Sequence, residues 1–455
     1  MNTSILDEKL IKKKIISMIL PITAENILQM TAGVVSMAMV SRISATAVGA
    51  IGIGTIIIRI IWAVLKGIAT GNSVFVAQSF GAKDYNRLRN SSIQALVIML
   101  GASLVFQQVI YWNAETLLKI FNPSPVLLEA GTSYLKILSF SLPFTGMILL
   151  AAGILQGMGN AKTPMIIVAI LNLINIFFSY ILVFGNFGLP VLGLSGAAIA
   201  YNISYVFASC LAVYSLFNRE SMFSKIRANA EEKFTMKGSM NLVKFAIPTS
   251  FEMSFWQFAS IIITRAVLTY GEIAYAAYQL GLQAESISFM PAAGFGIAAS
   301  TFIGQAIGSN DRELGRRYFK HLVKISLMIT FFAAMLLLLF PTIIMRALSS
   351  DLKVVSIGAV YLFVMGIVQV PQNVASLING ALRGAGYPNA AMINVGAGLW
   401  LVRVPLVLIV TYVLNANIYW IWIVMGLDLV VRFILAVIVF KKKDIFKQTQ
   451  IGANN

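Results

Sequence analysis

The stretch IPTSFEMSFWQFASIIITRAVLTY, from Ile247 to Tyr270, decides the fold, because it places Glu252 inside an otherwise apolar segment. As an α-helix, the stretch is long enough to cross the hydrocarbon core of a bilayer. A charged side chain at that depth costs on the order of a few kcal/mol, so an ionisable residue there indicates a function. The sequence therefore predicts a membrane-spanning helix with a functional carboxylate, four residues after Pro248.

The same arrangement occurs near the start of the chain, where Pro21 precedes Glu25 by four residues. Residues 25 and 252 are 227 positions apart, and sliding one half of the sequence over the other by this offset aligns most of it without a gap. The matches include Gly54 with Gly281, Gly67 with Gly294, Gln78 with Gln305, Asp84 with Asp311, Tyr134 with Tyr361, and Leu155-Gln156-Gly157 with Leu382-Arg383-Gly384. Matched glycines, glutamines and aspartates are not expected by chance, so they indicate an internal repeat.

The composition is that of a helical membrane protein. The chain has 455 residues, of which 58% are hydrophobic and 11% charged, and its mean hydropathy is +0.84. A soluble chain of this length needs more charge to cover its surface. Twelve apolar segments are predicted, at about 15–40, 47–79, 92–112, 126–150, 164–184, 195–217, 242–267, 274–306, 321–344, 356–380, 390–413 and 418–440.

These features predict an all-α polytopic membrane protein with twelve transmembrane helices in two six-helix lobes. Because each repeat crosses the membrane an even number of times, the lobes should be related by a pseudo-two-fold axis along the membrane normal. We expect an N-terminal lobe at 1–217, a linker at 218–241 and a C-terminal lobe at 242–455. Secondary transporters use such repeats to build a central site.

The net charge of +17 is a topology signal. About 23 of the 34 Lys and Arg residues fall in the termini and in every second loop, which predicts cytoplasmic termini in a bacterial-type plasma membrane. This distribution argues against a nucleic-acid partner. The single cysteine, Cys210, excludes an internal disulfide, and the single His321 offers no metal cluster.

Motifs spread over nearly the whole chain resemble the multidrug and toxic compound extrusion (MATE) family. They are Gln279-x-Gly281, Glu285-Ser286, Phe289-Met290-Pro291, Gly294-x-Gly296, Gln305-x-x-Gly308, Gln156-Gly157-Met158-Gly159-Asn160 and Ala381-Leu382-Arg383-Gly384-Ala385-Gly386. The resemblance implies twelve helices in two lobes, and export of organic, often cationic compounds against an inward flow of Na⁺ or H⁺.

The sequence departs from the family pattern at two places. The first helix of the family commonly reads V-D, four residues, then G-x-x-G, but here Ser36 occupies the aspartate position and both glycines are serines. Some branches also carry an acid in the tenth helix, where this chain has Gln372. Coupling schemes that depend on either acid therefore do not carry over.

Four acids, Glu25, Glu252, Glu285 and Asp428, lie well inside predicted spans. A cation exporter needs a carboxylate that holds either the substrate or the coupling ion, and we expect Glu252 to do so, with a possible Na⁺ site there. The alternative is a buried ion pair between Glu252 and Arg265 or Arg403. Glu25 is the second candidate, and Lys12 to Lys14 are its possible ion-pair partners.

For the other two acids, an ion pair is at least as good an explanation as a place in the cavity. Glu285 either lines the cavity or neutralises Arg59, Lys66 or Arg403. Asp428 lies four residues before Arg432, so an intrahelical ion pair explains it.

Polar and aromatic residues add further candidates. Gln369, Gln372, Asn373, Ser376 and Asn379 share one face of the tenth helix. Packing alone could explain two of them, and five favour a cavity wall, so we place the main polar site in the C-terminal lobe. Trp256, one turn after Glu252, offers a π face to a cation or to lipid. Tyr419, Trp420 and Trp422 are typical of an interfacial belt.

The leading hypothesis is a secondary antiporter that exports organic, cationic and amphipathic compounds in exchange for Na⁺ or H⁺ by alternating access. The alternative is a lipid-linked precursor flippase, which favours a more cationic cavity than Arg59, Lys66, Lys136, Arg265 and Arg403 form. A membrane enzyme is disfavoured, since no nucleophile–base pair or nucleotide-binding loop is present. We expect no cofactor beyond the coupling ion, a small organic substrate and membrane lipids as partners, and function as a monomer.

Overall fold

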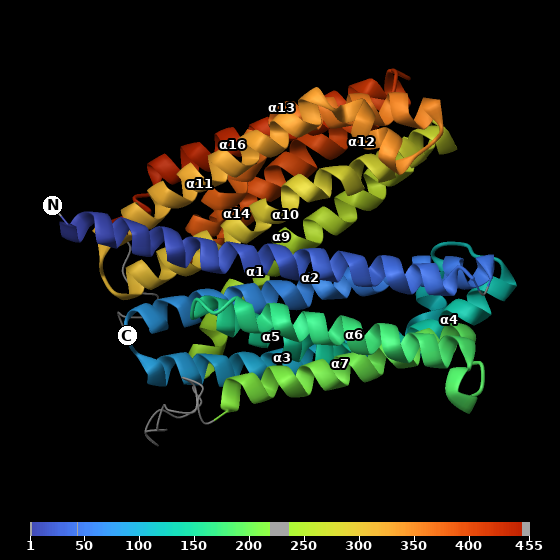
Figure 1. Ribbon diagram of the computed structural model, residues 1–455, viewed down its shortest axis with the longest axis horizontal. Helices are drawn as coiled ribbons and strands as arrows, with labels where there is room; N and C mark the ends of the chain where they lie inside the picture. Colours follow the sequence, from blue (N-terminus) through green and yellow to red (C-terminus); the bar gives the residue numbers. More distant parts are fainter. Residues whose placement is uncertain (1, 43, 219–235, 448–455) are drawn as a thin grey trace. The chain divides into compact units, whose positions relative to one another are not determined.

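The computed structural model describes residues 2–42, 44–218 and 236–447, and all its regular elements there are helical (Figure 1). Most of the predicted linker, including Asn229, lies outside these residues. The helices of the first repeat are α1 (Asn2–Val40), α2 (Ala45–Gly81), α3 (Tyr85–Lys119), α4 (Pro125–Ser139), α5 (Leu142–Gly157), α6 (Lys162–Phe184), η1 (Asn186–Gly188) and α7 (Gly193–Phe217).

The second repeat holds the remaining helices. They are α9 (Met236–Leu268), α10 (Glu272–Gly308), α11 (Arg312–Leu339), α12 (Pro341–Leu348), α13 (Leu352–Gly384), α14 (Pro388–Gly396), η2 (Ala397–Arg403), α15 (Val404–Leu408), η3 (Ile409–Val413), α16 (Tyr419–Lys442) and η4 (Ile445–Lys447). Within the described residues, ten spans are long and apolar enough to cross a membrane, and the bent pair of α4 and α5 makes an eleventh. The 33-residue helix α9, which carries Glu252, is not among these spans, although the sequence predicts a crossing there. The chain is therefore an all-α, multi-pass membrane protein.

Two spans that the sequence predicts as single helices are broken. The fourth bends by 48° between α4 and α5, where Pro143 lies in the first turn of α5. The ninth ends at Leu339, and α12 begins at Pro341. Proline lacks a backbone N–H and fits the first turn of a helix, and in both cases a proline lies in the first turn after the break.

The chain divides into two compact units that exchange parts of three helices, α1, α2 and α9. Unit 1 contains Met1–Thr23, Ala77–Lys83 and Phe251–Asn455, and unit 2 contains Ala24–Val76 and Asp84–Ser250. Each unit follows one predicted lobe for most of its length, but the first part of α1 belongs to unit 1 and the first part of α9 to unit 2. The lobe boundaries at 217 and 242 stay a prediction.

Glycines allow these exchanged segments to pack closely. In unit 2, a Cβ at Gly67 of α2 would collide with the backbone of Ser250 on α9. The hydroxyl of Thr249 donates to the Gly67 carbonyl at 2.7 Å, so a side chain of α9 bonds directly to the backbone of α2. In unit 1, Gly294 of α10 lies against Thr23 of α1. Since Gly67 and Gly294, like Thr23 and Ser250, are 227 residues apart, the fold repeats this contact.

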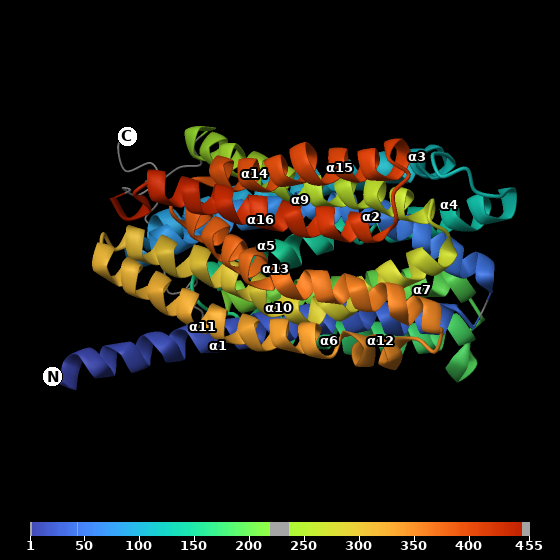
Figure 2. The same cartoon turned by 90° about the horizontal axis from the view of Figure 1, so that it is seen from above.

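The core of unit 1 forms where α10, α13 and α16 run alongside one another (Figures 1 and 2). Tyr278 stacks on Trp422 with ring centroids 5.5 Å apart, and Tyr361 meets both rings edge-on. The prediction of an interfacial belt is wrong for Trp422, which is fully buried, whereas Trp420 is exposed. Their positions differ because residues two apart on a helix point to different sides.

Candidate functional site

Glu252 is held by an arginine. The Nη1 atom of Arg383, in the last turn of α13, donates to Oε1 of Glu252 at 2.6 Å, and both side chains are buried. The sequence correctly anticipated an ion pair as one interpretation of Glu252, but named Arg265 or Arg403 as its base. The partner is Arg383, because the last turn of α13 lies beside Glu252 on α9.

Glu25 is also buried, but its partners are neutral. Its two carboxylate oxygens accept from Gln29 at 3.3 Å and from Gln156 at 3.2 Å. Among the described residues no lysine or arginine forms an ion pair with Glu25, Lys12 to Lys14 included. Lys66 is within electrostatic reach of the carboxylate without touching it. Glu25 is therefore a buried carboxylate whose charge no contact neutralises.

Glu285 has the same character in unit 1. The hydroxyl of Tyr361 donates to its Oε2 at 2.5 Å, and Gln372 Nε2 donates to its Oε1 at 3.3 Å. Arg403 interacts electrostatically with Glu285, but among the described residues it does not form an ion pair with it. Glu285 and Gln372, two candidates from the sequence, are thus brought together in one cluster.

The fourth acid, Asp428, is enclosed by two arginines. Arg432 donates from Nε to Asp428 Oδ1 at 2.8 Å, which confirms the predicted intrahelical pair. The sequence did not reveal that Arg403, from the π-helical segment η2, also reaches Asp428, with Nε 2.7 Å from Oδ2. Both Arg403 and Asp428 are almost completely buried, so Asp428 is a compensated charge.

Trp256 lies over this cluster. The guanidinium carbon of Arg403 is 5.3 Å from the centroid of the Trp256 ring, within the range of a cation–π contact. The π face predicted to receive a substrate cation is therefore already next to an arginine. The Trp256 side chain is still 41% exposed.

The polar face of α13 meets several helices. Gln369 accepts from Ser288 at 2.8 Å, Asn373 donates to Thr330 at 2.9 Å, and Asn379 accepts from Asn394 at 3.0 Å. Ser376 lies at the close crossing with Gly296 of α10. Within the described part of the chain, Gln372 is the one residue of this face that donates to a carboxylate, so the predicted cavity wall serves largely as a packing interface.

Unit 2 contains a polar row along α1 and α6. Asn172 donates to the Leu28 carbonyl at 2.7 Å, and Asn175 accepts from Ser36 at 3.0 Å. Ser36, at the position of the family aspartate, is thus a hydroxyl that donates to an amide. Two of the polar side chains on α6 therefore serve in hydrogen bonds to α1.

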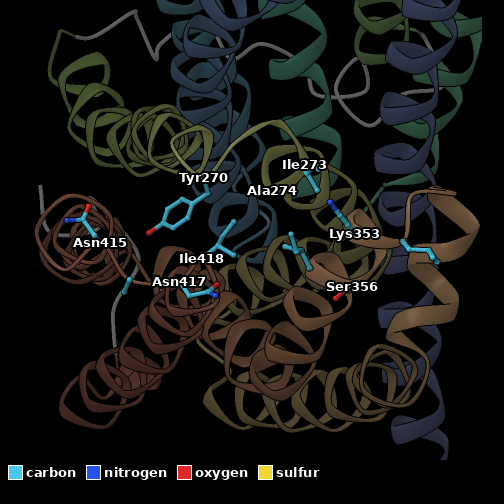
Figure 3. A pocket seen from close by; sticks show the side chains of 11 residues that line it. Tyr270, Ile273, Ala274, Lys353, Ser356, Asn415, Asn417 and Ile418 are labelled. Carbon is cyan, nitrogen blue, oxygen red and sulfur yellow. The ribbon is translucent and has the colours of Figure 1, made fainter.

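An open pocket in unit 1 is lined by residues near the ends of its helices (Figure 3). Its lining includes Tyr270, Lys353, Asn415 and Asn417. None of the four intramembrane acids lines it. Among the described residues, no group of three or more His, Cys, Asp or Glu side chains forms a metal site.

Comparison with known proteins agrees with the repeat. The MatE family model matches the chain twice, over residues 21–181 and 248–409, and the two matches begin 227 residues apart. The chain is 28% identical over 432 residues to a probable multidrug resistance protein NorM of Thermotoga maritima, covering 94% of this chain and 92% of that protein. It is 24% identical to the probable multidrug resistance protein YoeA of Bacillus subtilis, covering 95% of each.

Solved structures share the fold. A MATE structure in a bent conformation superimposes with a TM-score of 0.87 at 18% identity, covering 96% of each chain. A MOP superfamily transporter from Pyrococcus furiosus gives a TM-score of 0.86 at 18% identity, covering 95% of each chain. The two-lobe arrangement of twelve helices is consistent with these structures.

Proposed function

Because the chain belongs to the MatE family, we propose that it is a secondary antiporter that exports organic cations from the cell in exchange for Na⁺ or H⁺. The observation that carries the proposal is the partition of the four intramembrane acids. Glu252 and Asp428 are paired with arginines, whereas in the part of the chain that the structure describes Glu25 and Glu285 accept hydrogen bonds from neutral side chains only. A carboxylate without a fixed counter-ion attracts a cation strongly in a low-dielectric interior.

In this proposal, Glu285 with Tyr361 and Gln372 receives the positive charge of the substrate. The cluster lies in unit 1, between α10 and α13, and Gln372 is only partly buried. The aromatic surroundings suit an amphipathic cation, since Tyr278 and Tyr361 meet at 5.9 Å edge-on. The coupling ion then binds at another carboxylate. A Na⁺ ion at Glu252 would first have to displace Arg383 from a 2.6 Å contact.

The function is tested with the full-length protein reconstituted into liposomes and a fluorescent organic cation. Dye movement should follow an imposed Na⁺ gradient or an imposed pH gradient, and should stop when that gradient is collapsed. Liposomes without protein are the control. Dye that stays in place under both gradients, with folded protein present, would contradict the antiport.

We also propose that the chain lies in the plasma membrane as a monomer with both termini in the cytoplasm. In a Cys210→Ser background, a cysteine at Asn186 should react with an impermeant maleimide added to intact cells. A cysteine at Asn229 should react only after the cells are permeabilised, because the basic loops lie inside. External labelling of Asn229→Cys in sealed cells would reverse the topology.

A further inference from the structure

The repeat builds the same side-chain contact twice, with one difference. Glu25 and Glu252 are 227 residues apart, and so are their partners Gln156 and Arg383. Gln156 donates to Glu25 at 3.2 Å in unit 2, and Arg383 donates to Glu252 at 2.6 Å in unit 1. Both glutamates are buried. The two contacts therefore differ in whether the partner is a neutral amide or a guanidinium, and Gln29, the second partner of Glu25, corresponds to Trp256.

This difference decides which carboxylate is available to an ion. A guanidinium stays charged and offers fixed donors to a carboxylate, so Arg383 already neutralises Glu252. A glutamine side chain has no charge, and its amide can present either donors or an oxygen. The contact with Gln156 therefore leaves Glu25 with its charge and its ability to bind a cation.

We propose that Glu25, Gln156 and Gln29 form the site of the coupling cation, and that Arg383 is a built-in cation that permanently fills the equivalent place beside Glu252. The inference rests on the proposed antiport and adds where the ion binds. It assigns ion coupling to unit 2, while the substrate carboxylate Glu285 lies in unit 1.

Lys66 carries a positive charge that repels any cation bound at Glu25. It acts on the carboxylate electrostatically, yet its ammonium lies 6.0 Å from the Trp62 ring centroid and, among the described residues, it is in no ion pair. The equivalent position in the second repeat is Ala293. Lys66→Gln should therefore tighten cation binding at Glu25, since it removes an opposing field and breaks no ion pair among the described residues.

The cation is Na⁺ or a proton, and the two differ in what they need. Na⁺ needs several oxygens, which the carboxylate can supply together with Gln29 and Gln156 once their amides, which now donate N–H to Glu25, rotate to present their oxygens. A proton needs the carboxylate alone. Losing the Gln156 side-chain oxygen should therefore weaken Na⁺ binding and leave protonation of Glu25 largely intact.

The test exchanges the two partners and measures ion binding directly. Full-length protein in detergent is assayed for binding of ²²Na⁺ and, separately, for proton uptake across a pH titration. Gln156→Arg should reduce cation binding at least tenfold, since the new guanidinium imitates Arg383, whereas Arg383→Gln should add a second binding equivalent at Glu252. Gln156→Met and Arg383→Lys are the matched controls, because the first removes the amide without adding charge and the second keeps the charge.

Glutamate variants complete the test. Glu25→Gln should lose the cation and Glu252→Gln should keep it. The reverse pattern, or unchanged binding by folded Gln156→Arg protein, would overturn the assignment and return the ion to Glu252. If Gln156→Arg does not fold, the test rests on Arg383→Gln. That variant should bind one additional cation per protein, because it opens a site instead of closing one. Binding is read without substrate, so a failure of the antiport itself would show only in the liposome assay.

Discussion

Glu285→Gln is expected to weaken the binding of a cationic dye by about ten- to a hundredfold. A hydrogen bond to a charged group contributes about 1.5–3 kcal/mol, and each 1.4 kcal/mol corresponds to a factor of ten. The substitution keeps the shape of the side chain and its contact with Tyr361. The dissociation constant, measured by fluorescence anisotropy with purified protein, should rise for the cationic dye and stay nearly constant for a neutral analogue.

Glu115→Gln is the matched control for this loss of charge. Glu115 lies at the end of α3 in an exposed pair with Lys119, where an ion pair contributes little. Glu285→Asp should retain part of the affinity, because it keeps the charge and shortens the reach. An unchanged dissociation constant for the cationic dye in Glu285→Gln would remove Glu285 from the substrate site.

Asp428→Ala is expected to destabilise the protein by about 3–5 kcal/mol, the usual cost of leaving a buried charge without its partner. Asp428 is fully buried between Arg403 and Arg432, so its removal leaves two guanidinium groups facing each other. The melting temperature in detergent, followed by tryptophan fluorescence, should fall steeply and the protein should lose monodispersity.

Arg432→Met removes one positive charge from the cluster and keeps an unbranched side chain in its place, so it tests the charge apart from the packing. It leaves the Arg403–Asp428 pair intact and balanced, so its effect on the melting temperature should be far smaller than that of Asp428→Ala. Adding Arg403→Leu and Asp428→Leu to Arg432→Met should recover much of the loss, since apolar residues can replace a buried pair and no guanidinium is then left without its partner. Equal destabilisation by Arg432→Met and Asp428→Ala would show that the aspartate does not hold the cluster together.

The apolar runs and the internal repeat of the sequence predicted the architecture. Apolar runs separated by polar loops indicated the twelve spans, and the 227-residue offset indicated two equivalent halves. The intrahelical pair of Asp428 and Arg432 was predictable because a spacing of four residues places both on one helix face.

The partners between helices were not predictable in the same way. Gln156 and Arg383 matched in the repeat, and so did Glu25 and Glu252, but no spacing along the chain shows that the end of α5 meets α1 or that the end of α13 meets α9. For the same reason the base paired with Glu252 was misidentified. The polar face of α13 was predicted as a surface, but its side chains bond to three different helices, a distinction that depends on tertiary packing.

The exchanged segment at the start of α1 has a consequence for how the protein is made. Met1–Thr23 is synthesised before unit 2, but it belongs to unit 1 together with Phe251–Asn455. Its neighbour Gly294 on α10 is synthesised only after unit 2 is complete. The first segment must therefore wait in the bilayer with its final packing face uncovered, and a truncated chain ending at the linker would leave that face without its partner. Neither half of the gene encodes a complete folding unit.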